Sequence, residues 1–231
     1  MKRYFAIPFF IFFASCAAIT KHGPVKTEQR TVAAFTRIHA SRAIDIDFTP
    51  AASCSVTVEA PDDLLPKITT ECSSGTLNIS LDGSCSNINE PLKVHLQGPS
   101  LEAADLSGAC SFELKSPLNG TDFHLDLEGA SSFNGTLYMK SINASLTGAS
   151  EADLEGMTNN LTVDLSGASS LSAEKLSSVV SVVKAEGASE AGVRADSAID
   201  AQASGASSIS YKGKPVSIRK ESSGASSIEN D

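Results

Sequence analysis

The sequence of 231 residues contains no tryptophan, only 3 tyrosines, and 18 lysine and arginine residues against 27 aspartate and glutamate residues. The net charge of -9 argues against nucleic acid as a partner, because binding to a phosphate backbone depends on cationic side chains. The lack of aromatic residues leaves few platforms for stacking a sugar ring. Hydrophobic residues still make up 41% of the chain, which is enough for a folded core.

Long apolar runs are also scarce, and the clearest one, Tyr4–Ala14, follows two basic residues and is too short to span a bilayer as a mature helix. This arrangement is typical of a cleaved signal peptide. The run ends on Phe13-Ala14-Ser15-Cys16, which resembles the bacterial lipobox, whose cysteine becomes the lipidated first residue. We therefore predict a lipoprotein signal peptide over residues 1–15, lipidation at Cys16 and a tether over residues 16–30. The alternative is ordinary signal-peptide cleavage with Cys16 uninvolved.

A Gly-Ala pair recurs through the second half of the chain at steps of 18 to 21 residues. Apolar residues stand mostly two and four positions before each glycine, with polar residues between them, and this period of two indicates a β-strand. A second apolar position follows four residues after each glycine, which predicts another short strand beyond a Gly-Ala-Ser corner. The repeated glycines are Gly108, Gly129, Gly148, Gly167, Gly187, Gly205 and Gly224.

A repeat of about 19 residues is too short for a helical hairpin or a propeller blade, and the leucine-rich pattern is absent. The sequence therefore predicts an all-β solenoid over residues 101–231, a parallel β-helix with about 19–20 residues in each rung. Glycine would form the corner, where stacked backbones leave no room for a side chain. The small residues just past the corner, with Cys110 in the first rung and serine in the others, would form a ladder of stacked side chains.

Residues 31–100 lack the Gly-Ala repeat but alternate between apolar and polar residues in four short segments, and we expect an all-β head or cap there. The chain also carries a combination of motifs, each weak alone: Phe35-x-x-Ile38 with Ala43-Ile44-Asp45-Ile46, Glu59-Ala60-Pro61-Asp62-Asp63-Leu64-Leu65-Pro66-Lys67-Ile68, Gly75-Thr76-Leu77-Asn78-Ile79, and the Ser-Gly-Ala-Ser repeats.

In this combination the chain resembles the putative auto-transporter adhesin, head GIN domain family of bacterial lipoproteins, over nearly all of the predicted mature sequence. The resemblance implies a right-handed β-helix, in agreement with the repeat. It also implies an adhesin-like role, and it brings no catalytic or binding residues with it.

Residues capable of chemistry are few. Asp105, Asp126 and Asp164 share one repeat position and could pair as carboxylates or bind a cation, but we favour solvent-facing positions of an acidic protein. Four histidines lie at unrelated places in the repeat, without the spacing of zinc ligands. They are His22, His39, His95 and His124. We expect no enzyme activity, no metal and no cofactor.

Four cysteines remain after Cys16, and an exported protein meets an oxidising compartment. Cys54, Cys72, Cys85 and Cys110 could form two disulfides in 3 connectivities. We favour Cys54 with Cys72, which leaves Cys85 with Cys110, and buried free thiols are the alternative.

Three functions fit these observations. The first is a non-catalytic cell-envelope lipoprotein, held at the outer membrane by its lipid, that binds a surface protein or a glycan through the β-helix faces. The second is a carbohydrate-binding or carbohydrate-active protein, which the lack of aromatic residues and long loops disfavours. The third is a structural spacer that forms homo-oligomers through the edges of the solenoid.

Overall fold

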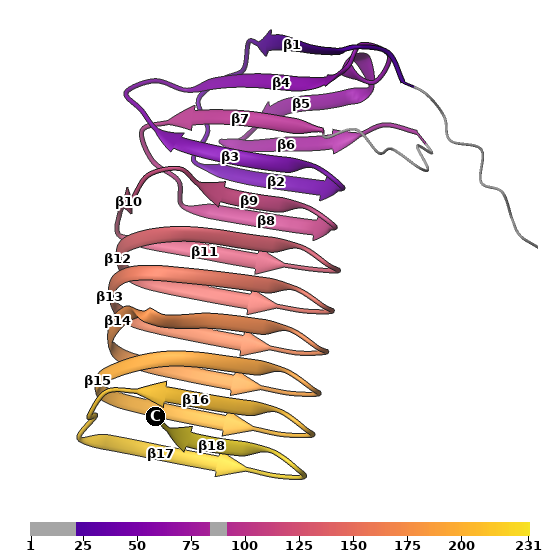
Figure 1. The fold of residues 1–231 in the computed structure, drawn as a ribbon. Helices are drawn as coiled ribbons and strands as arrows, with labels where there is room; N and C mark the ends of the chain where they lie inside the picture. Colours follow the sequence, from indigo (N-terminus) through magenta and orange to yellow (C-terminus); the bar gives the residue numbers. More distant parts are fainter. Residues whose placement is uncertain (1–21, 84–91) are drawn as a thin grey trace, which may run out of the picture.

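The computed structural model describes residues 22–83 and 92–231, and these residues form an elongated stack of strands (Figure 1). Within them, the one helix that is found is the 3-10 turn η1 (Leu65–Lys67), and no helix is long and apolar enough to cross a membrane. The strands are β1 (Val25–Arg30), β2 (Arg37–Arg42), β3 (Asp45–Pro50), β4 (Ser55–Pro61), β5 (Ile68–Ser73), β6 (Thr76–Leu81), β7 (Lys93–Gly98), β8 (Ala103–Gly108), β9 (Ser111–Leu114), β10 (Leu118–Asn119), β11 (Asp122–Leu127), β12 (Ser132–Leu146), β13 (Glu151–Leu165), β14 (Ser170–Ala185), β15 (Glu190–Ala203), β16 (Ser208–Lys212), β17 (Ser217–Ser222) and β18 (Ser227–Asn230).

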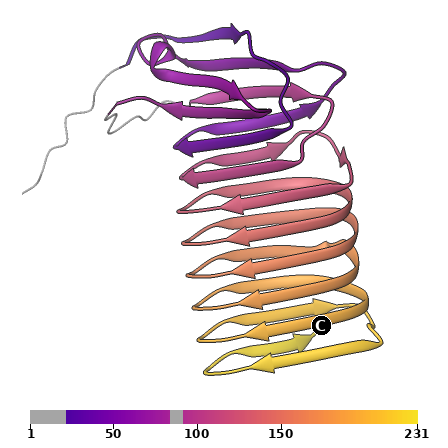
Figure 2. The ribbon, with the colours of Figure 1, turned by 180° about the vertical axis from the view of Figure 1, so that it is seen from behind.

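The stack is a parallel β-helix, which confirms the predicted fold class. Each rung has a tight corner on one edge and a wider bend on the other, and both edges are visible in Figures 1 and 2. Strands β12 to β15 run through the bend, so each contributes to two faces of the stack. Neighbouring rungs pair in parallel at equivalent repeat positions, for example Leu146 with Leu165.

Side chains alternate between the core and the solvent along each strand. Leu127 and Leu165 are buried in the core, whereas Asp126 is half-buried and Asp164 is exposed on the outer face. The expected directions of these four side chains are confirmed. The core between the two faces is filled almost entirely by aliphatic side chains and a few phenylalanines, because each rung places the same alternating pattern over the one before it.

The corners bring two backbones into unusually close contact. At the seven repeated glycines φ lies between 77° and 87°, a region that side chains other than glycine rarely adopt. The N–H of Ala149 donates to the carbonyl oxygen of Gly129 in the neighbouring rung at 2.7 Å. A Cβ on Gly148 would lie 2.6 Å from that same oxygen, so the close stacking depends on the missing side chain.

The N-terminal region continues the stack instead of forming a separate unit. Strand β2 lies in parallel between β6 and β8, and β3 lies in parallel between β7 and β9. Antiparallel strands then cover this end of the stack: β4 pairs with β7, β1 with β4, and β5 with β6. The segment predicted as a head therefore supplies two rungs and a cap.

The corner between β2 and β3 carries Arg42 where later rungs carry glycine. Arg42 has a φ of 78° and lies in register with Gly108. Its guanidinium Nη1 donates to the carbonyl oxygen of Gly83 at 2.9 Å. Ser41-Arg42-Ala43 is thus a further corner of the series, one that holds a non-glycine residue in the left-handed region at a cost of about 1 kcal/mol.

The predicted tether is too long by at least the residues of β1. Val25–Arg30 form this strand, which pairs along its full length with β4. The edge of β4 would otherwise expose unpaired backbone groups, and β1 satisfies them. The chain is already fixed to the cap at His22, whose Nδ1 lies 2.8 Å from Asp63 Oδ2, and the Gly23 N–H donates to Asp63 Oδ1.

The last rung closes the other end with polar side chains. Lys220 occupies the inward position that Ala201 holds in β15. Its ammonium lies 4.5 Å from the centre of the Tyr211 ring and donates to the carbonyl oxygen of Ile228. The short strands and the inward lysine leave a poor template for a further strand.

We expect Gly148→Ala to lower the free energy of unfolding by about 2 kcal/mol or more, because the new Cβ meets the Gly129 carbonyl and the backbone is in the left-handed region. Gly192→Ala is the matched control, since its Cβ would meet only the flexible side chain of Glu174 and its φ is not in that region. Denaturant unfolding of both variants measures the difference. Equal losses in the two variants would contradict the close-stacking account of the corner.

Candidate functional site

A groove of about 620 Å³ lies where the two N-terminal rungs meet the regular rungs. At this level the continuous bend of β12 to β15 is replaced by separate segments, since β7 ends at Gly98 and the chain reaches β8 only at Ala103. The interruption leaves a hollow beside the strands. Its walls include Arg37, Asp105, His124 and Asn143.

The strand register places two carboxylates side by side at this groove. Asp105 of β8 pairs directly with Asp126 of β11, and His39 of β2 lies opposite Asp105 on its other side. His124 stands two residues before Asp126 on the same face of β11. The described geometry thus brings two of the three predicted aspartates together with two histidines.

The third aspartate stays apart. Asp164 is separated from Asp126 by the rung that carries Ser145 at the same position. The acidic ladder expected from the repeat is therefore interrupted, and the carboxylate pair is confined to the junction with the N-terminal rungs.

The environment of Asp105 opposes ionisation. Partial burial is the main cause that raises the pKa of this carboxyl, and the charge of Asp126 raises it further. His124, His39 and Arg37 act in the opposite direction through their positive charge. Asp105 therefore keeps its proton to a higher pH than an exposed aspartate does, and as a neutral acid it could donate a hydrogen bond into the groove.

Both histidines of this group were named from the sequence but were not placed beside the aspartates, because the repeat position of His39 was hidden. His39 stands three residues before Arg42, as Asp105 stands three residues before Gly108. Recognition of Arg42 as a corner residue would have aligned His39 with the aspartates. The other two histidines lie elsewhere: His22 contacts Asp63, and His95 lies between Asp47 and Glu59.

Within residues 22–83 and 92–231, no group of three or more histidine, cysteine, aspartate and glutamate side chains is arranged to hold a metal ion. The side chains of Arg37, Asp105, His124 and Asn143 supply the groove with polar donors and acceptors.

The small residues past the corners form a hydrogen-bonded ladder. Ser150 Oγ donates to the carbonyl oxygen of Thr147 at 2.8 Å, and serines of the other rungs repeat this bond to the residue three positions earlier. Cys110 occupies the same place in its rung, and its thiol contacts the carbonyl oxygens of Ser107 and Arg42. Burial is the main cause that raises the pKa of the Cys110 thiol, which keeps it protonated and unreactive.

The other cysteines do not approach Cys110 in the described residues. Cys54 and Cys72 are free thiols that contact the neighbouring carbonyl oxygens of Phe35 and Ala34, respectively. Cys85 and the predicted lipidation site Cys16 lie outside the described residues. The disulfide pairings therefore stay predictions.

Comparison with known proteins supports this fold. A family model described as putative auto-transporter adhesin, head GIN domain matches residues 34–215. The structure of a putative adhesin from Bacteroides fragilis NCTC 9343 is similar, with a TM-score of 0.86 and 21% identity over 90% of this chain and 97% of that one.

Two structures from Parabacteroides distasonis ATCC 8503 also match over 90% of this chain. One is titled a putative lipid binding protein, with a TM-score of 0.70, 18% identity and 97% of its own length covered. The other is titled a putative adhesin, with a TM-score of 0.68, 19% identity and 98% covered. At these identities the likeness shows the fold. No curated protein matches the chain.

We expect Asp105→Asn to raise the melting temperature at pH 7. The pKa of Asp105 is raised in the folded protein, so ionisation of this carboxyl lowers the free energy of unfolding. The loss begins as the pH rises above about 4, the pKa of an unfolded aspartate, and is complete above the higher pKa of the folded state. The gain should therefore vanish below about pH 4. Asp164→Asn, at the exposed position of the same repeat site, is the control and should not raise the melting temperature. A rise for Asp105→Asn that is independent of pH would contradict its assignment to the ionisation of Asp105.

We expect Cys110→Ser to change the free energy of unfolding by less than about 1 kcal/mol, because serine fills the same slot in the other rungs and makes the same bond. Cys110→Val should cost about 1 to 3 kcal/mol, since it adds a methyl group to a tight site and removes the donor. Denaturant unfolding compares the two variants. A larger loss with serine than with valine would show that Cys110 has a role beyond the ladder.

Proposed function

The chain belongs to the putative auto-transporter adhesin, head GIN domain family, and from this premise we propose that it is a non-catalytic, adhesin-like lipoprotein of the bacterial cell envelope. In this proposal Cys16 carries the lipid and the outer membrane holds it. The β-helix presents its faces to a surface protein or a glycan.

The single observation that carries the proposal is the regular register of the outer faces on either side of the bend, since the register shifts of β13 and β14 lie between Asp153 and Val180, at the bend. From β12 to β15 the same outward positions repeat in adjacent strands, such as Asn134 with Asp153 and Asp153 with Ser172. Short polar side chains at a spacing of about 4.8 Å make a flat, repetitive surface suited to binding by shape and hydrogen bonds. Such binding is weak for one site and gains strength when many anchored copies act together.

The N-terminal contacts fit an anchored protein. His22 stands only six positions after Cys16, and an extended chain of that length spans at most about 22 Å. Asp63 holds the chain at His22 and Gly23, and this contact with His22 is the main cause that lowers the pKa of Asp63. A lipid on Cys16 would therefore keep the cap close to the membrane.

The groove at Asp105 supports a second candidate, a glycan-binding protein. Arg37, His124, Asn143 and a readily protonated Asp105 line one hollow, and together they supply donors and acceptors for hydroxyl groups. A glycan would then be bound at this hollow, not along the flat face.

Metabolic labelling with a palmitate analogue tests the anchor. We expect label in the wild-type protein and none in Cys16→Ser, because only the cysteine can carry the acyl chains. Protease treatment of intact cells then distinguishes a surface-exposed protein from a periplasmic one. Equal labelling of both variants would contradict lipidation at Cys16.

Immobilised mature protein on a glycan array, together with an assay for reducing ends released from polysaccharides, tests the binding role. We expect no release of reducing ends. Binding that Asp105→Ala abolishes would favour the groove, and binding that survives this change would favour the faces. Polysaccharide turnover that depends on Asp105 or Asp126 would contradict the non-catalytic proposal.

A further inference from the structure

The bend edge of the stack carries most of the exposed large hydrophobic side chains of the described residues. Of seven such residues, Val25 lies on the cap, and Ile218 holds in the last rung the inward position of the buried Ile199. Met157 is 59% exposed and Val216 is 94% exposed. We call the remaining five the bend stripe: Tyr138, Met157, Val179, Val182 and Val216.

The bend stripe follows the bend over several rungs and is interrupted in the rung of β15, where Ser197 lies next to Val216. Tyr138 pairs with Met157 in the adjacent strand, and Val182 lies on the strand between those of Thr162 and Asp200. The N–H of Val216 donates to the carbonyl oxygen of Ser197, which places it directly below the bend of β15. Scattered apolar residues are normal on a surface, but a row along one edge marks an interaction site.

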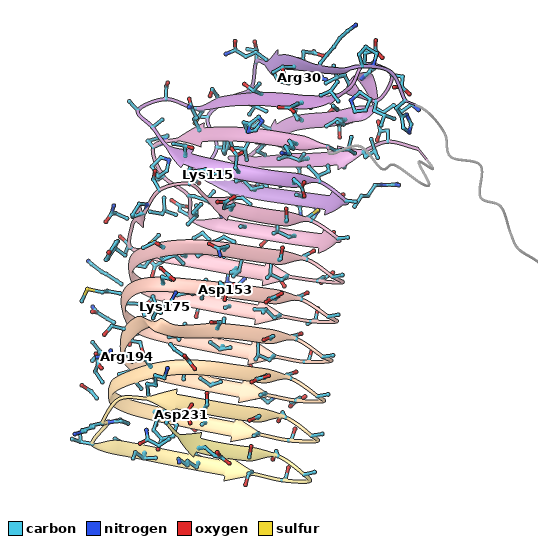
Figure 3. All side chains as sticks on the ribbon, viewed as in Figure 1. Arg30, Lys115, Asp153, Lys175, Arg194 and Asp231 are labelled. Atoms are coloured by element: carbon cyan, nitrogen blue, oxygen red, sulfur yellow. The ribbon has the colours of Figure 1, made fainter. Side chains whose placement is uncertain are left out.

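The charges beside the bend stripe are neutralised within the chain. Each acidic side chain that flanks it is paired with a cation: Glu155 with Lys175, Glu174 with Lys212, Asp196 with Arg194, and Asp200 with Arg219. Figure 3 shows Lys175 and Arg194 on this edge. Lys140 and Lys214 have no ion-pair partner in residues 22–83 and 92–231, so the stripe is locally neutral or positive.

The rest of the protein is different, because the chain as a whole has a net charge of -9. Two copies therefore repel each other over most of their surface. At the bend stripe this repulsion is absent and apolar area is available. The lower repulsion thus favours this edge for contact between copies.

We propose that the bend stripe binds the bend stripe of a second copy of this chain, about a two-fold axis parallel to the stack. In this arrangement each apolar residue meets its own counterpart, and the interface is isologous and closed, as in most homodimers. The long stem of Lys140 allows its ammonium to turn toward solvent at the rim.

The position of the lipid anchor, which rests on the proposed function, supports a second copy of this chain as the partner. Strand β1 begins on the corner edge of the cap, as Figures 1 and 2 both show, so the lipid would be attached on the side opposite the bend stripe. Copies on one membrane would share the direction of their stacks, as the two-fold axis requires. The stripe is narrow, and the interface is therefore weak in solution and forms when tethering raises the local concentration into the millimolar range.

The test uses the mature chain from residue 17, held on nickel-chelating vesicles by an N-terminal histidine tag, so that it does not depend on lipidation. Met157→Cys places one thiol at the stripe, and Ala188→Cys places one at the exposed corner as the matched control. A short bismaleimide crosslinker is added at equal protein density. We expect at least tenfold more crosslinked dimer from Met157→Cys than from Ala188→Cys and from the protein with its native cysteines alone.

A second pair of variants tests the apolar contact itself. Asn159→Cys, at the exposed bend beside Met157, serves as the reporter of dimer formation. Adding Met157→Glu and Val179→Glu to the reporter should reduce the crosslinked dimer at least tenfold, whereas adding Glu190→Gln at the corner should not. Equal crosslinking at bend and corner, or dimer that survives both glutamates, would overturn the proposal, and failure of palmitate labelling alone would affect only the lipid anchor.

Discussion

The hydrogen bond from each corner alanine to the carbonyl oxygen of the corner residue in the neighbouring rung sets the geometry of the whole stack. That residue is a glycine except at Arg42, which accepts from Ala109. The bond requires two backbones to approach so closely that a Cβ at Gly148 would lie 2.6 Å from the oxygen of Gly129. Once this contact fixes the corner, a shift of one residue would turn every apolar side chain outward, so the register of the strands is fixed as well. The core, the serine ladder and the outer faces all follow from that register.

The corner contact also explains why so much of the fold could be predicted. Because the contact favours glycine at each corner, glycine recurs in the sequence with the period of the rungs. The alternation of apolar and polar residues before each glycine then correctly predicts that Leu127 faces the core and Asp126 the solvent. Arg42 shows the limit of this argument. It adopts the same left-handed conformation as Gly108, but this corner lacks the Gly-Ala pair that identifies the others. The rung formed by β2 and β3 was therefore assigned to a separate head.

The candidate site could not be predicted because it depends on pairings between distant segments. His39 meets Asp105 across 66 positions of the chain only because β2 lies on β8, while β6 pairs on the other side of β2. The groove likewise arises where the chain crosses from β7 to β8 and the bend is interrupted. Strand β1 was missed for a related reason, since its partner β4 begins 25 residues after β1 ends and its side chains are mostly exposed. A repeat pattern contains no information on such contacts.

The two edges of the stack are therefore free to differ. At the corner, the close backbone contact restricts the residue types, although Arg42 takes the place of glycine in one corner and Cys110 takes the place of serine in another. At the bend, differences in rung length are absorbed: the steps of 20 and 18 residues around Gly187 produce register shifts near Ala173 and Ser178, within β14, and the corners stay aligned. An edge that tolerates added residues and side chains can acquire a binding surface without disturbing the core. Most of the exposed large hydrophobic residues lie on that edge, as expected if the corner serves the fold and the bend serves contacts with other molecules.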